Sequence, residues 1–155
     1  MPDLWQEVKM KRTVCLVGSS QATLEQAEEK IREVLSWEEA ENTIIVNCNC
    51  KGIDRIANDI ARELGFMITV ITQKDLGLKS NSRGEWFKNQ EITNDKCAEI
   101  ADIAYSIALP IGTSKGKSSC TYCKKAGLPY NHEKTAGCRT ILKCEKSITL
   151  VVGLK

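Results

Sequence analysis

The sequence predicts an α/β fold, a three-layer sandwich with a mostly parallel sheet between two layers of helices. Short apolar runs rich in β-branched residues alternate with segments whose apolar residues recur at helical spacing. This alternation is typical of a doubly wound parallel sheet, because each strand is followed by a helix that crosses back over the sheet. The end of the chain departs from it: two apolar runs, 140–143 and 148–152, predict a C-terminal β-hairpin extension.

The strands and helices follow one another in the order that such a fold requires. The first strand is predicted over 12–17, and a helix with apolar residues on one face from Leu24 to Leu35 follows it. Thr23 and Gln26 have the spacing of a capping box, which satisfies free backbone N–H groups at a helix start. The other predicted elements are a strand at 43–47, a helix at 53–64, a strand at 67–72, a loop at 73–83, a helix at about 85–101, a strand at 103–109 and a short helix that ends near Gly127.

Length and composition predict a single domain over 1–155, with a core at about 12–130 and a cysteine-rich extension at 131–155. The chain is 42% hydrophobic and 27% charged, which is ordinary for a soluble globular protein. A net charge of +2 gives no reason to expect a nucleic-acid partner. Apolar runs are far shorter than the roughly 20 residues that span a bilayer. The N-terminus has no signal-peptide pattern, so we expect a cytoplasmic protein without a membrane partner.

Three predicted loops lie outside the carboxyl ends of the strands, where open parallel sheets bind their ligands. Each loop is small or polar and leads into a helix, whose first backbone N–H groups are free to bind an anion. One such loop alone suits an ordinary tight turn, but three together predict a phosphate-bearing ligand. The loops are Gly18-Ser19-Ser20, the segment 47–54 with Asn47, Lys51, Gly52 and Asp54, and the segment 112–119 with Gly112, Thr113, Ser114, Lys115 and Gly116.

The charged residues and cysteines of these loops have alternative interpretations. Asp54 is the best acidic candidate for the site, and it equally suits a role in stabilising the positive start of the helix at 53–64. Lys115 and Lys117 can each act as a point charge against phosphate, or they can be simply solvated. Cys48 and Cys50 are unexpected residues in a turn of this kind.

Five short motifs follow one another between residues 12 and 130 and carry a family resemblance. They are Val14-Cys15-Leu16-Val17-Gly18-Ser19-Ser20, Lys51-Gly52-Ile53-Asp54-Arg55-Ile56-Ala57, Lys88-Asn89-Gln90-Glu91-Ile92, Ala101-Asp102-Ile103-Ala104, and Gly112-Thr113-Ser114-Lys115-Gly116 followed by Lys124-Lys125-Ala126-Gly127-Leu128-Pro129. Their order resembles the SLOG superfamily, the Rossmann-like proteins related to the DNA-processing SMF/DprA group and the LOG nucleotide hydrolases. The resemblance is closest to its small stand-alone members.

The resemblance implies a Rossmann-like domain that binds a nucleotide or nucleotide derivative across these loops, with Lys88 and Asn89 added to the site. A binding or sensor module is the leading hypothesis, and a homodimer is an open alternative for its assembly. The alternative function is a nucleotide-processing hydrolase that uses Asp54 as acid or base on an N-glycosidic or phosphate bond. The hydrolase branch carries a glutamate in its P-G-G-x-G-T-x-x-E pattern, and this chain has Gly116 there, which disfavours phosphoribohydrolase activity.

The chain has eight cysteines, and four of them cluster around its only histidine. Cys15 and Cys97 lie singly in apolar or helical segments and are predicted to be core residues. Cys-x-x-Cys spacing lets two thiolates share one tetrahedral zinc ion, which a histidine or a third cysteine can complete. Three interpretations are open for the cluster: a disulfide or redox pair, unlinked thiols, or a structural zinc site at Cys120, Cys123, His132 and Cys138, with Cys144 as a further candidate ligand.

Overall fold

The parallel sheet predicted from the sequence is present in the computed structural model of the chain, which describes residues 11–153. Within these residues five strands form one sheet in the order β3-β2-β1-β4-β5, and every neighbouring pair is parallel. The strands are β1 (Arg12–Gly18), β2 (Thr43–Asn47), β3 (Met67–Val70), β4 (Ile103–Ala108) and β5 (Ser147–Val151). The predicted α/β, Rossmann-like fold class is therefore confirmed.

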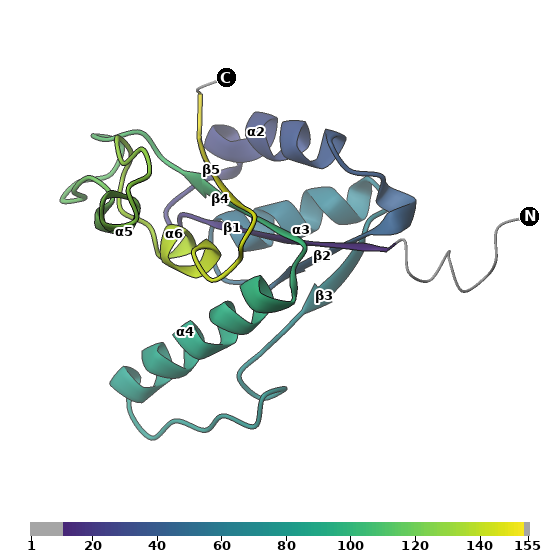
Figure 1. Cartoon of the computed structure of the whole chain (residues 1–155), viewed down its shortest axis with the longest axis horizontal. Coiled ribbons are helices and arrows are strands. Elements are labelled where there is room, and N and C mark those ends of the chain that lie inside the picture. The colour runs from purple at the N-terminus through teal and green to yellow at the C-terminus, as the bar shows by residue number, and fades with distance from the viewer. Residues whose placement is uncertain (1–10, 154–155) are drawn as a thin grey trace, which may run out of the picture.

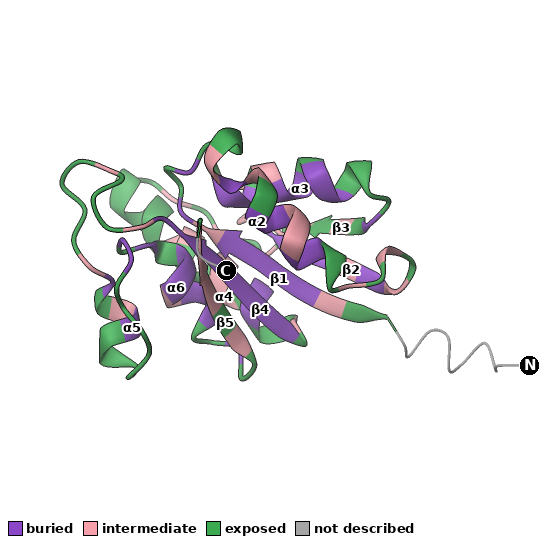
Figure 2. Cartoon of the chain, turned by 90° about the horizontal axis from the view of Figure 1, so that it is seen from above, coloured by how far each residue is buried: buried purple, intermediate pink, exposed green. Residues whose placement is uncertain are grey.

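Helices cover both faces of this sheet (Figure 1). On one face lie α2 (Leu24–Ser36) and α3 (Ile53–Glu63), and on the other lie α4 (Arg83–Ile100) and α6 (Ala136–Ile141). A hydrophobic core lies on each face of the sheet, and successive residues of β1 point into different cores. Val14 and Leu16 pack with α2 and α3, while Cys15 and Val17 pack with α4 and α6. Figure 2 shows the resulting burial of the central strands, which explains why their sequences read as continuous apolar runs.

The start of α2 carries the predicted capping box. The Thr23 hydroxyl accepts a hydrogen bond from the Gln26 N–H, and the Gln26 side chain accepts one from the Thr23 N–H. At α4, the side chain of Ser82 accepts from the Glu85 N–H. Two shorter elements, the 3₁₀ turn η1 (Ala40–Asn42) and the helix α5 (Thr121–Lys125), complete the described chain.

The predicted C-terminal hairpin is wrong. Residues 140–143 were expected to be its first strand, but Thr140 and Ile141 belong to α6. The second run forms β5, which pairs with β4 in parallel. A parallel neighbour requires a long crossover, and the segment from 109 to 146 supplies it through α5 and α6. Residues 131–151 thus provide a helix and an edge strand of the same sandwich.

The order of the strands places a topological switch beside β1. From β1 the chain moves through β2 to β3 at one edge, and β4 then returns to the other side of β1. The helix that follows β1, α2, therefore covers one face of the sheet, and α6, which follows β4, covers the other. Open α/β sheets form their ligand crevice at the carboxyl ends of two such strands. In the described part of the chain, no helix combines the length and apolar character needed to cross a membrane.

Candidate ligand cavity and metal centre

A cavity of about 530 Å³ lies at the carboxyl end of β1. Five parts of the chain form it: the turn after β1, the entry to α3, one face of α4, the loop after β4, and the segment that leads into α6. Its size falls in the range of ordinary small-molecule sites. The lining residues are Val17, Gly18, Ser19, Ser20, Cys50, Lys51, Asp54, Trp86, Phe87, Gln90, Glu91, Asn94, Lys117, Lys134, Thr135, Ala136, Gly137 and Thr140.

Glycines allow three of these parts to meet. Gly52 has a φ of 92°, and a Cβ there would lie 2.3 Å from the backbone oxygen of Ser19. A Cβ on Gly137 would lie 2.6 Å from the Cα of Gly18. A side chain at either position would separate the turn after β1 from α3 or from α6. Gly18, Gly52 and Gly137 thus allow these three parts of the backbone to pack against one another.

A buried asparagine network shapes the loop between β2 and α3. The Asn47 side chain donates to the Leu16 carbonyl and to Asn58 Oδ1, both at 2.9 Å, and Asn58 donates back to Asn47 Oδ1 at 2.8 Å. These bonds satisfy Asn47 inside the protein, so its role is to hold the loop. The Cys48 side chain packs against the core on the α4 and α6 face of the sheet, and its sulfur lies 3.7 Å from that of Cys97. Cys50 instead lines the cavity.

Asp54 lies in the first turn of α3 and is only 5% exposed, yet it lines the cavity. Its carboxylate accepts a hydrogen bond of 3.4 Å from the Cys50 N–H. Burial raises the pKa of Asp54 to about 7, because desolvation disfavours the charged form more than the backbone hydrogen bonds favour it. A carboxyl group with such a pKa can exchange protons near neutral pH, as a general acid or base requires.

Three lysines, Lys51, Lys117 and Lys134, bring positive charge to the cavity from different segments. Among the described residues, none of the three forms an ion pair; Lys134 instead places its ammonium 5.1 Å from the centre of the Tyr122 ring. On the acidic side, Glu91 lies 3.7 Å from the Arg139 guanidinium. Burial favours the neutral, protonated form of Asp54 below about pH 7. In that form Asp54 does not offset the positive charge of the three lysines.

An aromatic pair on α4 forms another part of the lining. The rings of Trp86 and Phe87 meet edge to face at 5.2 Å, and their exposed fractions are 44% and 51%. The Arg83 guanidinium lies 5.5 Å from the centre of the Phe87 ring. Exposed aromatic faces beside a cavity provide a stacking surface for a planar ligand group, since burying such a ring is favourable.

The structure brings together only part of the predicted ligand set. Gly18, Ser19, Ser20, Lys51 and Asp54 line the cavity, and Lys117 joins them while Lys115 does not. Outside the lining, Gly52 packs beneath the turn after β1 and Asn47 is buried in the asparagine network. The remaining candidates also lie outside the lining: Lys88, Asn89, whose side chain donates to the Lys79 carbonyl, and Gly112, Thr113, Ser114 and Gly116 in the turns after β4.

The sequence analysis placed Lys88 and Asn89 of α4 in the site, but it missed the α4 residues that line the cavity, and it missed the segment before α6. A usable signal existed on α4: Trp86, Gln90 and Asn94 recur every four residues, which places them on one helical face. For Lys134 and Gly137 there was no local signal, because their place in the cavity depends on how the cysteine-rich segment folds back over β1.

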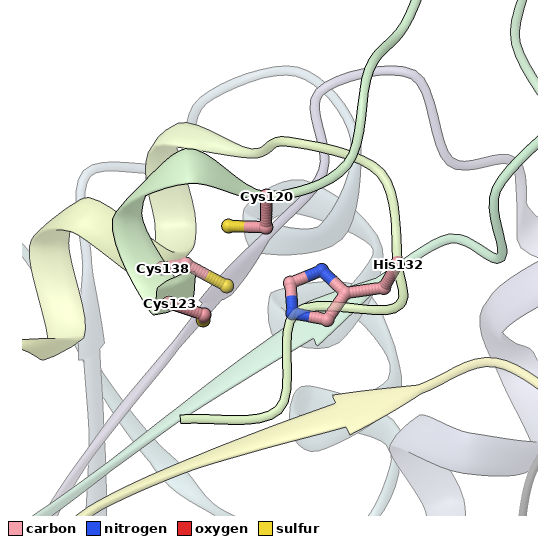
Figure 3. A group of neighbouring side chains, drawn as sticks. All are labelled: Cys120, Cys123, His132 and Cys138. Atoms are coloured by element: carbon pink, nitrogen blue, oxygen red, sulfur yellow. The ribbon is translucent and has the colours of Figure 1, made fainter. Parts of the chain in front are cut away.

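The cysteine-rich segment forms a second candidate site, and the predicted ligand set is the one that converges. One potential ligand atom from each of Cys120, Cys123, His132 and Cys138 lies within 4.8 Å of the others, and all four residues are buried. Cys120 caps α5, Cys123 lies within it, His132 comes from the following loop, and Cys138 belongs to α6. Figure 3 shows the imidazole of His132 facing the three cysteine side chains.

A hydrogen bond at Nδ1 selects the tautomer of the histidine that can bind a metal ion through Nε2. Its Nδ1 lies 3.0 Å from the Glu133 carbonyl, which can only accept, so Nδ1 carries the proton. Nε2 then presents a lone pair, and it is buried with no hydrogen-bond partner among the described residues. A buried nitrogen without a partner is costly, and a metal ion is the partner that this arrangement suits.

Hydroxyl groups of the sheet surround the sulfur atoms. Ser106 on β4 lies 3.4 Å from the Cys138 sulfur, and Thr149 on β5 lies 3.5 Å from Cys138 and 3.8 Å from Cys123. Hydroxyls at this range can donate to thiolates, as outer-shell groups of metal centres do. Burial raises the pKa of the Cys138 thiol, so the deprotonated form requires a positive partner.

The other cysteines have separate roles. All eight are free thiols and lie in the described part of the chain. Cys15 and Cys97 are fully buried core residues, as predicted. Cys144, the further candidate ligand, instead points its sulfur at the carbonyls of Ala101 and Lys146, at 3.7 and 3.4 Å. The group of side chains that could hold a metal ion is thus limited to three cysteines and one histidine.

The described residues therefore define an α/β protein of Rossmann-like class with a cavity at the topological switch and a buried three-cysteine, one-histidine cluster that can hold a metal ion. Comparisons of the chain with known protein families, with curated proteins and with solved structures found no match. The function must be argued from the two sites themselves.

Proposed function

We propose that the protein binds a nucleotide or nucleotide derivative in the cavity at the carboxyl end of β1. One observation carries the proposal: the same cavity combines three lysines without ion pairs among the described residues with an exposed aromatic pair. Phosphate groups suit ammonium charges, and a planar base suits the face of a tryptophan or phenylalanine ring. A ligand that carries both groups uses both parts of the lining.

The resemblance of the sequence to the SLOG superfamily supports the same proposal. Of the motifs that carry it, the turn at Gly18, the segment from Lys51 to Asp54 and the motif at 88–92, through Gln90 and Glu91, lie at the cavity. The cavity is of the size that accepts a mononucleotide, and its position matches the general ligand crevice of open α/β sheets. A sensor or binding module of SLOG type is the function that these features favour.

Asp54 supports a second candidate function, a nucleotide-processing hydrolase. Its carboxyl group faces the cavity, and a pKa of about 7 lets it donate or accept a proton near neutral pH. Incubation of the protein with nucleotides distinguishes the two functions. Release of free base or phosphate that is lost in Asp54→Asn supports the hydrolase, and binding without turnover supports the sensor.

Calorimetric titration with adenosine 5′-monophosphate tests the binding proposal. We expect Lys51→Ala and Lys117→Ala each to weaken binding about tenfold, which is the order of one lost charge-assisted hydrogen bond. Lys115→Ala is the matched control, because this lysine lies in the same loop as Lys117 but outside the lining. Titration with adenosine alone and with inorganic phosphate alone separates the aromatic from the lysine contribution. Equal effects of Lys115→Ala and Lys117→Ala would contradict the proposal.

We also propose that the cluster of Cys120, Cys123, His132 and Cys138 holds a structural zinc ion. Tetrahedral zinc with Zn–S bonds of about 2.3 Å places sulfurs about 3.8 Å apart, so small side-chain shifts suffice from a spread of 4.8 Å. Four protein ligands leave no open position, which is typical of a structural rather than a catalytic site. The ion would supply the positive charge that stabilises the buried thiolates.

Metal analysis of protein purified without chelator tests the zinc site. We expect one zinc per chain, and thiolate-to-cobalt charge-transfer bands with tetrahedral ligand-field bands after cobalt replacement. Cys123→Ser should lose both, whereas Cys144→Ser should retain both because Cys144 is also buried but lies outside the cluster. Retention of a full metal equivalent by Cys123→Ser would contradict the assignment.

A further inference from the structure

We infer that the zinc centre positions one wall of the ligand cavity, so that ligand binding depends on metal occupancy. This inference rests on the proposed binding function and on the proposed metal. It assigns to Cys120, Cys123, His132 and Cys138 a positioning role for Lys117 and Lys134. Three features of the segments 114–120 and 130–138 support this role.

The first feature is that the metal ligands join the two segments that carry these lysines. The Cys120 N–H donates to the His132 carbonyl at 2.9 Å, and the Lys134 N–H donates to the Ser118 carbonyl at 2.8 Å. Between these bonds, Ser119 and Glu133 form an antiparallel bridge. Lys117 and Lys134 therefore lie in two short segments that pair with each other. The cluster of three cysteines and one histidine lies at one end of this two-stranded unit.

The second feature is that this unit has little apolar core of its own. Hydrogen bonds also hold it, because the Ser114 N–H donates to the buried Glu133 carboxylate and the Glu133 N–H donates to the Leu109 carbonyl at 2.8 Å. Most residues between 111 and 131 are exposed, and α5 and α6 are only five and six residues long. The small core of the unit consists of Cys120, Cys123 and Cys138, with Tyr122 packed against them. Apolar burial on this scale cannot order a loop of such length, and metal-ligand bonds commonly replace it in small units.

The third feature is that the unit forms the cavity wall directly. The lining residues Lys134, Thr135, Ala136 and Gly137 lie between two metal ligands in the sequence, His132 and Cys138. Gly137 also packs against Gly18, so a shift of this segment moves the turn after β1 as well. The opposite wall is independent of the cluster, because Lys51 and Asp54 belong to the α3 entry.

Hydrogen exchange on the full chain tests the positioning role without any nucleotide. Protein loaded with zinc is compared with protein stripped by a chelator and with stripped protein given zinc again. We expect amides in 114–120 and 130–138 to exchange at least tenfold faster after stripping and to recover with zinc, while those in 43–64 do not change. Unchanged exchange in 130–138 would overturn the inference, and so would a loss of protection throughout 43–64, because the effect would then not be local.

Titration with adenosine 5′-monophosphate adds the functional readout. In the loaded protein, Lys134→Ala and Lys51→Ala should each weaken binding about tenfold. Stripping should weaken binding of the unchanged chain at least tenfold, after which Lys134→Ala should have little further effect and Lys51→Ala should keep its full effect. Equal effects of Lys134→Ala in both forms would overturn the inference. If the loaded protein binds no nucleotide, the proposed function fails, and hydrogen exchange alone decides whether zinc positions the wall.

Discussion

Replacing Asp54 with asparagine should stabilise the protein above neutral pH and have little effect in acid. The side chain is buried, and its pKa is raised from 3.8 to about 7 by desolvation. Folding then favours the protonated carboxyl, while the unfolded chain releases the proton readily. Stability from this group therefore falls as the pH rises from about 4 to about 7 and stays low above that. Asparagine is similar in shape, has no charge, and avoids this loss.

The size of the effect follows from the separation of the two pKa values. About 3 pH units at about 1.4 kcal/mol each correspond to about 4 kcal/mol. The position of Asp54 in the first turn of α3 offsets part of this, because the helix dipole stabilises a carboxylate there by up to about 1 kcal/mol. We therefore expect Asp54→Asn to be more stable than the unchanged chain by about 3 kcal/mol at pH 8, and by much less at pH 4.5.

Urea unfolding followed by far-ultraviolet circular dichroism measures this difference at several pH values, in the presence of a reducing agent. Asp59→Asn is the matched control, since Asp59 is an exposed residue of the same helix paired with Arg62 at 3.2 Å. The control should show less than about 1 kcal/mol at any pH. If Asp54→Asn instead lowers stability at pH 8, the carboxylate is charged in the folded protein and stabilises the helix start, and the reasoning from desolvation is refuted.

Three further substitutions test the contacts that build the two sites. Gly52→Ala should destabilise the fold by several kcal/mol more than Gly65→Ala. Both glycines have a positive φ, but only at Gly52 would the Cβ meet backbone, at 2.3 Å from the Ser19 carbonyl oxygen. Equal losses of unfolding free energy in urea would contradict this. Arg139→Ala should cost about 1–3 kcal/mol, because its guanidinium binds Asp95 on α4 through two bonds of 2.8 and 3.1 Å, whereas Arg62→Ala on the exposed pair should cost under about 1 kcal/mol in the same assay. Thr149→Val should weaken zinc binding about tenfold in competition with a chromogenic chelator, since it removes the hydroxyl beside two cluster sulfurs; an unchanged affinity would show that the hydroxyl does not donate to them.

The strands and main helices were predictable because their signals are local. β-branched runs gave β1 and β2, and helical spacing gave α2 and α3. The run at 140–143 misled because four residues are too few to display a helical period, while Ile141 favours strands. What decides its state is packing: the buried residues Cys138 and Ile141 are three apart, and that spacing points both inward only in a helix.

The two sites differed in how much the sequence reveals. The Cys-x-x-Cys pair is a local signal, and the chain offers one histidine to complete it, so the ligand set was predictable within the choice between Cys138 and Cys144. The cavity depends on five segments, and only the turns after β1, β2 and β4 carry a local signature, the last of these contributing Lys117 alone. The lining from α4 was missed because periodicity indicates which residues share a face but not which face meets a cavity.

The contrast between the two cavity walls suits the proposed metal centre beside a Rossmann-like sheet. The wall at α3 is held by an apolar helix face, with Ile53, Ala57 and Ile60 buried, and by the amide network around Asn47. The opposite wall must carry exposed lysines and cross from β4 to β5, so it cannot bury a comparable apolar face. A metal centre provides order at four points while leaving the rest of the segment polar. With the proposed zinc ion bound, positive charge and a fixed position at Lys134 are compatible, because the ordering would come from ligand bonds rather than from apolar burial.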